Sequence, residues 1–284
     1  MTTIRTNTLT PQQKTEILHL QTICSGLGTN VFLSNEMNTD QSLPCFFLTY
    51  EKEKLVGFLA AFLPTTVEVE INGFVHPHHR RRGIFSSLII EAKKTYASQG
   101  FLQMLFQVES SSKSGKSYAN RRFPHIDHSE YHMSLSKSRW LGRRMPAPKG
   151  GTLLEATAEV LPQYVRIATL LLREDADFIE RMLCDPARKG YLYLYEGKPI
   201  GVLQQYTEDT DLTMLHAVAI DEAYRGQGHG KAMLCMALER FFISGESISL
   251  EVDSQNPRAL GLYYDLGFEI DFQIDYHAVN LLYL

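Results

Sequence analysis

Apolar and polar positions follow two patterns along this chain, one typical of buried strands and one typical of amphipathic helices. The sharpest change lies between Leu212 and Met233, where an apolar run rich in branched residues ends at Ile220. Such a run predicts a central strand buried on both faces. From Lys231 to Arg240 the apolar residues recur with helical spacing, which predicts a helix. A glycine-bearing corner joins the two elements.

The remaining pattern predicts alternating helices and strands in both halves. The first half predicts a helix, three strands, a helix and two strands, at Pro11–Ser25, Cys45–Tyr50, Leu55–Phe62, Val67–Val75, Ser86–Ser98, Leu102–Val108 and Glu130–Leu135. Around the corner, the second half predicts strand, two helices, two strands, then strand, helix and strand, at Leu153–Thr157, Leu161–Leu172, Ala176–Cys184, Tyr191–Tyr195, Ile200–Tyr206, Ile248–Val252, Pro257–Leu266 and Phe268–Leu284.

The order of elements repeats. Placing Gly83 on Gly228 also places Arg80 on Arg225. Two diverged copies of one mixed α/β fold explain this correspondence. We expect a first domain at 1–138, a basic, proline- and glycine-bearing linker at 139–152, and a second domain at 153–284.

Composition and charge narrow the class of protein. The 284 residues are 44% hydrophobic, which is enough to fill two cores. No apolar run reaches the roughly 20 residues that span a membrane, and the amino terminus lacks a signal-peptide segment, so we expect a cytoplasmic protein. The four scattered cysteines indicate reduced, buried thiols. A net charge of -4 gives no drive toward nucleic acid.

The corner itself, Arg225-Gly226-Gln227-Gly228-His229-Gly230, suits an anion-binding turn. Glycines let a backbone approach a ligand closely, and the amides that open a helix bind anions such as a pyrophosphate. The spacing matches neither the P-loop nor the dinucleotide fingerprint, since Lys231 stands where the last glycine of the fingerprint belongs. A simple tight connection would explain the same glycines.

Beyond the corner, the chain offers three candidate residues for acyl-transfer chemistry. This chemistry requires a base for the attacking amine and an acid for the leaving thiolate. Glu251 alternates away from its apolar neighbours on a strand, and Tyr263 lies on the following helix. Asn256 begins that helix. Taken singly, they also fit a solvated carboxylate, a packing tyrosine and a helix cap.

Taken together, the corner and the run LEVDSQNPRALGLYYDLGF resemble the GNAT superfamily of N-acyltransferases, and most closely its ribosomal-protein alanine N-acetyltransferases. The resemblance is specific over residues 199–268. It implies that Glu251 is the general base and Tyr263 the general acid. It also implies that coenzyme A is contacted by the end of the strand, by the corner and by the residue that caps the following helix. These residues are Val218, Ala219 and Ile220 in the strand, Arg225, Gly226, Gln227, Gly228, His229, Gly230 and Lys231 in the corner, and Asn256 at the cap. The alanine specificity is not implied.

The first copy departs from this pattern. Gln107 stands in the place of the base and Ala119 in the place of the acid, with Tyr118 one position away. Ser112 replaces the asparagine, and Phe85 replaces the last glycine of the corner. We therefore expect a degenerate first domain with weak or absent acyl-CoA binding.

Histidines gather in two places without the spacing of a metal site. His76, His78 and His79 precede three arginines on one turn, and we interpret this stretch as a solvated or phosphate-facing loop. We interpret His125, His128 and His132 as strand and loop residues. No metal is expected.

The sequence thus predicts an N-acetyltransferase that joins acetyl-CoA and a primary amine in a ternary complex, with the chemistry in the second domain. The acceptor is a small molecule or a peptide, and no nucleic acid or membrane partner is expected. A noncatalytic acyl-CoA-binding scaffold and a tRNA-dependent aminoacyl transferase are the alternatives. Neither the acceptor nor the oligomeric state follows from the sequence.

Overall fold

The chain forms two compact units in a computed structural model that describes residues 1–24, 31–143, 150–207 and 212–281. The first unit comprises Met1–Ser129 and Phe272–Leu284, and the second unit comprises Glu130–Asp271. Each unit is one sheet covered by helices.

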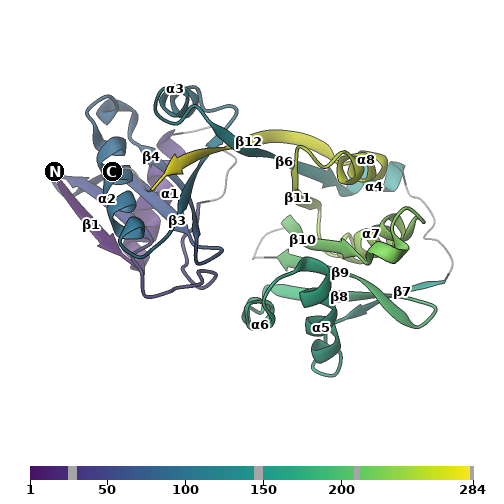
Figure 1. Cartoon of the computed structure of the whole chain (residues 1–284). Coiled ribbons are helices and arrows are strands. Elements are labelled where there is room, and N and C mark those ends of the chain that lie inside the picture. The colour runs from purple at the N-terminus through teal and green to yellow at the C-terminus, as the bar shows by residue number, and fades with distance from the viewer. Residues whose placement is uncertain (25–30, 144–149, 208–211, 282–284) are drawn as a thin grey trace. The chain divides into compact units, whose positions relative to one another are not determined.

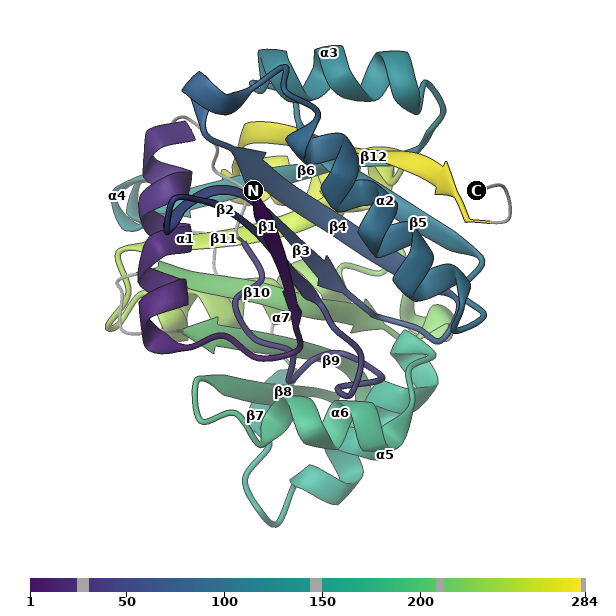
Figure 2. The same cartoon turned by 90° about the vertical axis from the view of Figure 1, so that its left-hand side faces the viewer.

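The first unit is built on a sheet in the order β1-β2-β3-β4-β5-β12 (Figure 1). Neighbouring strands are antiparallel except β4 and β5, which are parallel. Helix α1 contacts β3 and β4, and α2 contacts β2, β3 and β4; both helices are labelled in Figure 2. The elements are β1 (Thr2–Thr6), α1 (Pro11–Cys24), β2 (Phe46–Glu51), β3 (Lys54–Phe62), β4 (Glu68–Val75), η1 (Pro77–His79), α2 (Ile84–Ala97), β5 (Gln103–Glu109), α3 (Lys113–Arg122) and β12 (Glu269–Asn280).

The second unit has a sheet in the order β6-β11-β10-β9-β8-β7, in which β10 and β11 are the parallel pair. Its elements are β6 (Ile126–Ser136), α4 (Lys137–Gly142), β7 (Gly151–Glu155), α5 (Leu161–Leu172), α6 (Ala176–Leu183), β8 (Arg188–Tyr195), β9 (Lys198–Thr207), β10 (Leu212–Ile220), η2 (Glu222–Tyr224), α7 (His229–Phe241), β11 (Ser247–Asp253) and α8 (Pro257–Leu266).

Both faces of the second sheet are covered, which explains its nearly continuous apolar strands. Leu203, Leu215 and Leu250 point to the face covered by α7 and α8. Leu192 and Val202 point to the opposite face, where α5 and α6 pack. The alternation of strand side chains therefore sorts this sheet into a face under α7 and a face under α5.

The two sequence copies exchange their last strands. Strand β6, at the end of the first copy, pairs with a strand of the second copy, and β12, at the end of the second copy, pairs with a strand of the first. The expectation that Glu130–Leu135 closes the first copy is wrong, because this part of β6 pairs antiparallel with β11. Likewise β12, at the end of the second copy, pairs with β5 over Ile274–Asn280. The compact units thus differ from the expected segments 1–138 and 153–284. An alternating pattern identifies a strand but does not specify its partner.

The remaining differences fall on short or exposed elements. Helix α4 begins at Lys137 and ends at Gly142, within the expected linker, and residues 144–149 of that linker lie outside the described residues. The pattern does not predict β1 or α3, because β1 is mostly exposed and α3 buries only Ala119. All four cysteines are free, and Cys184 is exposed rather than buried. Among the described helices none is long and apolar enough to span a membrane.

Candidate active site

Strands β10 and β11 separate at the middle of the second sheet. They pair from Leu212 to Leu215 on β10, and no pairing continues beyond Leu215 among the described residues. At this point β10 also shifts its register against β9, between His216 and Ala219, and Ala217 adopts a positive φ of 53°. A bulge of this kind redirects the strand. The backbone of Val218–Ile220 is therefore open toward β11.

The corner after Ile220 is held by its own side chains. Arg225 Nε donates to the Ile220 carbonyl at 2.9 Å, and Gln227 Nε2 donates to the Ala223 carbonyl at 2.9 Å. Gly226 and Gly228 have φ values of 76° and 88°, a region that other residues rarely adopt. A Cβ on either glycine would meet no protein atom within 4 Å. The conformation requires glycine and leaves the space beside it open.

The amides of this corner are available to a ligand. Within the described parts of the chain, no protein acceptor receives a hydrogen bond from the amides of residues 226–231. They open α7, whose positive dipole end favours an anion. The side chain of His229 is buried against the Tyr195 ring, 4.4 Å between centroids, and Lys231 Nζ lies 3.1 Å from Asp265 Oδ2. A contact from His229 is therefore limited to its backbone.

Glu251 follows directly after Leu250, the last residue of β11 that pairs with β10, and it lies on the face under α5. Its side chain is accessible to solvent, yet the protein around its carboxyl disfavours the charged form. Burial, assisted by the negative charge of Glu130, raises the pKa of Glu251 to about 7. A carboxyl with this pKa can accept a proton near neutral pH.

Tyr263 and Asn256 lie on α8, which packs on the other face. Tyr263 is 7% exposed, and its ring meets Phe268 edge-on at 5.7 Å between centroids. Burial raises its pKa to about 12. Among the described residues its hydroxyl has no hydrogen-bond partner. Asn256 caps α8, since its Oδ1 accepts from the Ala259 amide at 3.1 Å.

Beside Glu251 lies a polar group of residues that sequence reasoning does not identify. His132 on β6 stands directly opposite Glu251 in the strand pairing. Its Nδ1 lies 3.0 Å from Asp271 Oδ2, and Ser134 Oγ donates to Asp271 Oδ1 at 2.9 Å. No spacing in the sequence links these residues to Glu251, because β6 reaches β11 only through the exchange of strands.

The first unit repeats the corner in detail. Arg80 Nε donates to the Val75 carbonyl at 3.0 Å, and Gly83, with a φ of 80°, precedes α2 as Gly228 precedes α7. However, Arg81 occupies the first glycine position with a φ of 64°. Phe85 replaces the last glycine, and its ring lies 5.2 Å from that of Phe106.

The gap between the parallel strands of the first unit is occupied by side chains. Gln107, which corresponds to Glu251, accepts from Asn72 Nδ2 at 3.0 Å and donates to Glu70 Oε2 at 2.7 Å. A cavity of about 40 Å³ remains beside them. Strand β4 pairs with β3 without a register shift, so it lacks the bulge of β10. The ladder between β4 and β5 also ends early, at Ile71 opposite Phe106. This unit therefore shares the corner and the separation of the parallel strands, but it lacks the bulge, and side chains fill its gap.

The histidine and arginine turn of the first unit is partly neutralised. Glu51 lies 3.0 Å from His79 Nε2 and 2.7 Å from Arg82. In the described ranges of the chain, no group of three or more His, Cys, Asp or Glu residues is arranged to hold a metal ion.

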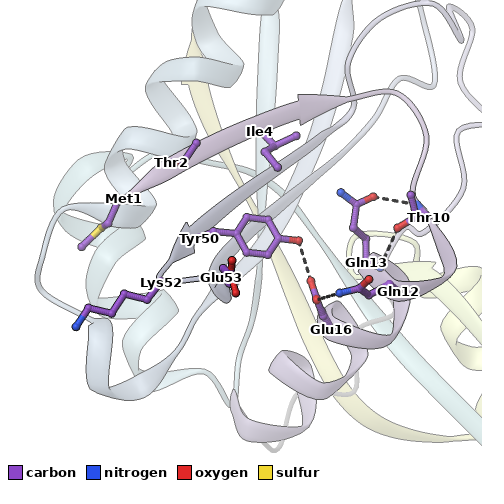
Figure 3. Close-up of a pocket in the computed structure, with 10 residues that line it drawn as sticks. All are labelled: Met1, Thr2, Ile4, Thr10, Gln12, Gln13, Glu16, Tyr50, Lys52 and Glu53. Carbon is purple, nitrogen blue, oxygen red and sulfur yellow. Dashed lines mark hydrogen bonds between the residues drawn. The ribbon is translucent and has the colours of Figure 1, made fainter.

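A hollow on the surface of the first unit is shown in Figure 3. Its volume is about 600 Å³, and residues of β1, α1 and the β2–β3 turn line it. Glu16 accepts hydrogen bonds there from Tyr50 at 2.8 Å and from Gln12 at 2.9 Å (Figure 3). Thr10 and Gln13 cap α1 reciprocally. These polar side chains satisfy one another, which is typical of a structural role.

Comparisons with known proteins identify the family of the chain. The sequence model of the acetyltransferase (GNAT) family matches residues 18–120 and 155–268. A 55-residue segment is 38% identical to the N-alpha-acetyltransferase RimI of Mycobacterium tuberculosis. Another match of 55 residues is 42% identical to an uncharacterized protein of Mycobacterium leprae. These segments cover 19% of the chain in each case, and 34% and 15% of the two relatives.

Solved structures share the fold at low identity. A tandem GNAT protein from the clavulanic acid biosynthesis pathway superposes with a TM-score of 0.67 at 19% identity, over 83% of this chain and 82% of that protein. A GNAT-family acetyltransferase from Colwellia psychrerythraea gives 0.69 at 13% identity, over 99% and 100%. Because the family model matches both repeats, the chain belongs to the acetyltransferase (GNAT) family, which uses acetyl-CoA, and it carries two segments of that family.

Proposed function

We propose that the second unit transfers an acetyl group from acetyl-CoA to a primary amine by direct attack within a ternary complex. The observation that carries this proposal is the combination of an open corner of unpaired amides with a separated strand pair that bears Glu251. An anion at the corner would place the rest of a coenzyme A molecule along the open edge of β10.

In this proposal the donor is held mainly by main chain. The amides of Gly226–Lys231 bind the pyrophosphate, as the helix dipole favours. The open backbone of Val218–Ile220 binds the pantetheine and acetyl part, and Asn256 contacts the coenzyme from the start of α8. Arg225 contributes by holding the corner against Ile220, as its bond to the carbonyl supports.

The chemistry needs a base for the acceptor and an acid for the leaving group. Glu251 accepts a proton from the ammonium form of the acceptor, directly or through water, which its raised pKa favours. The amine nitrogen then attacks the thioester carbonyl, and the carbon–sulfur bond breaks as the tetrahedral intermediate collapses. Tyr263 donates its proton to the departing thiolate, and its phenolate regains a proton from the second one that the nitrogen releases as the amide forms. Its hydroxyl stays protonated at neutral pH because burial raises its pKa to about 12.

We further propose that the first unit has a structural role and binds acyl-CoA weakly or not at all. Gln107 cannot act as a base, and it fills the gap between the strands with hydrogen bonds. The aromatic side chain of Phe85 stands where the second unit has a glycine.

The test is acetyl-CoA consumption, followed as thiol release, across a panel of primary amines. Glu251→Gln and Tyr263→Phe should each lower kcat by about 10²-fold or more while changing coenzyme A affinity little. Tyr264→Phe, at the exposed neighbouring tyrosine, and Glu174→Gln, at an exposed loop carboxylate, are the matched controls. Full turnover in both active-site variants would remove their roles. Coenzyme A binding without turnover of any amine would instead support a noncatalytic binding protein.

A further inference from the structure

The face of the second sheet that carries Glu251 also carries a buried arginine. Strand pairing places Arg188 opposite Tyr206, Tyr206 opposite Met214, and Met214 opposite Ser249. Alternation puts these residues on the face under α5, because Leu192 and Val202 point there. Glu251 lies two residues beyond Ser249 on the same face.

Arg188 lacks the partners that a buried guanidinium requires. Its side chain is 11% exposed, and its Nε makes no hydrogen bond. Arg188 forms a loose ion pair with Asp185, whose Oδ2 lies 3.8 Å from Nε, beyond hydrogen-bonding distance. The guanidinium carbon stands 4.5 Å from the centroid of the Tyr206 ring, a cation–π contact. An incompletely paired cation of this kind is costly to bury unless a ligand completes its hydrogen bonds.

Two other unsatisfied groups lie on this face or against it. The hydroxyl of Tyr164 is buried and makes no hydrogen bond of good geometry, although the Gln204 amide lies close to it, and its ring covers Gly190, two residues from Arg188. Ser249 Oγ is also buried without a partner. Both groups can donate to an acceptor oxygen. Of the seven buried unsatisfied side-chain atoms found in the described residues, two therefore belong to this sheet face, and a third belongs to α5, which packs on it.

Near neutral pH the positive charge on this part of the face comes from Arg188 and not from the neighbouring His216. His216 lies between Arg188 and Glu251 in the strand order, opposite Gln204. Burial, together with the charge of Arg188, lowers the pKa of His216 to about 4, so its ring is neutral near pH 7. The planar guanidinium with a free Nε edge fits a carboxylate, which accepts two parallel hydrogen bonds.

We propose that the acetyl acceptor is a primary amine that bears a carboxylate, and that Arg188 binds this carboxylate while Glu251 receives the proton of the amine. This inference rests on the proposed acetyl transfer in the same unit. Arg188 and Glu251 lie on β8 and β11, three strand spacings apart, or roughly 14 Å between backbones. The carboxylate must therefore be separated from the amine by several bonds, as in an ω-amino acid or a peptide.

The test compares 6-aminohexanoate with its neutral carboxamide as acceptors. We expect kcat/KM for the carboxylate to exceed that for the amide by about 10- to 100-fold, the range for a charge-assisted pair. Arg188→Gln should abolish this preference through KM, and Arg188→Lys should retain only part of it. Arg166→Gln, at an exposed position of α5, is the control and should change nothing. Melting temperature and coenzyme A affinity confirm that each variant is folded.

Calorimetric binding of 6-aminohexanoate without acetyl-CoA is measured in parallel. Loss of this binding in Arg188→Gln supports the inference even if turnover fails, whereas failure of every amine as an acceptor would refute only the proposed function. Equal use of carboxylate and amide, or binding that is unchanged in Arg188→Gln, would overturn the inference and leave acetyl transfer standing.

Discussion

Glu130 raises the pKa of Glu251, so removing its charge should change the pH at which the protein works. The substitution Glu130→Gln keeps the size of the side chain and removes the negative charge. If Glu251 is the base, activity rises with pH as its carboxyl loses a proton, with a midpoint near the pKa of about 7. Without the neighbouring charge the carboxylate becomes easier to form. The acidic limb of kcat/KM should therefore move to lower pH.

Strand pairing gives the magnitude. Asp253 pairs with Glu130 and Glu251 with His132, so Glu130 and Glu251 are diagonal neighbours on one face. Side chains in such positions lie about 7 to 8 Å apart. Coulomb's law then gives about 0.5 kcal/mol at the dielectric constant of water and about 2 kcal/mol at an effective value of 20. Since Glu251 is accessible to solvent, we expect a displacement of about 0.5 to 1 pH unit.

The assay is the pH profile of kcat/KM from pH 5 to 9 with one amine at limiting concentration. Glu174→Gln, which removes an exposed loop carboxylate of the second unit, is the control and should leave the limb in place. A limb that stays unchanged in Glu130→Gln, or that moves to higher pH, would refute the assignment of the limb to Glu251.

Three further predictions concern folding and stability. In Gly201→Ala the new Cβ would lie 2.5 Å from Ile220 Cδ1, so we expect about 1 to 3 kcal/mol of destabilisation and weaker coenzyme A binding. Denaturant melts and calorimetry would show it, and unchanged values in both would contradict it. Segments 1–138 and 153–284, expressed separately, should aggregate because each lacks the strand that the other supplies, and co-expression should restore solubility. Cooperative melting of each segment alone would refute this. A carboxyl whose pKa is raised on folding contributes stability that is present below its unfolded pKa near 4.5 and lost as pH rises through about 7. Glu251→Gln should therefore raise the melting temperature at pH 8 but not at pH 4, and an equal change at both pH values would show that ionisation of Glu251 is not the cause.

Local pattern was sufficient for most elements because their apolar stripes are strong. The strand at Leu212–Ile220 and the helix at Pro257–Leu266 have the expected bounds, and α7 begins two residues earlier than expected, at His229. The pattern did not predict helix α3 and strand β1, because these elements bury few side chains. Elements that contribute few residues to a core leave little trace in the hydrophobic pattern.

Some residues of the candidate site could be identified from the sequence, and others could not. The corner glycines and the alternation of Glu251 are local features, and the sequence shows them directly. His132 and Asp271 could not be associated with Glu251, since they lie more than a hundred residues away or on an exchanged strand. Arg188 precedes the predicted strand Tyr191–Tyr195, and no pattern in the sequence marks it as a site residue.

By itself, the sequence determined that the chain carries two related folds and that the second retains the corner, the carboxylate and the phenol, because these depend on residue type and spacing. Only the tertiary structure decided which strands pair, which charges surround Glu251, and that Arg188 is buried with an unsatisfied nitrogen. Those properties depend on distances between segments remote in the chain, and hydrophobic periodicity carries no information about such distances.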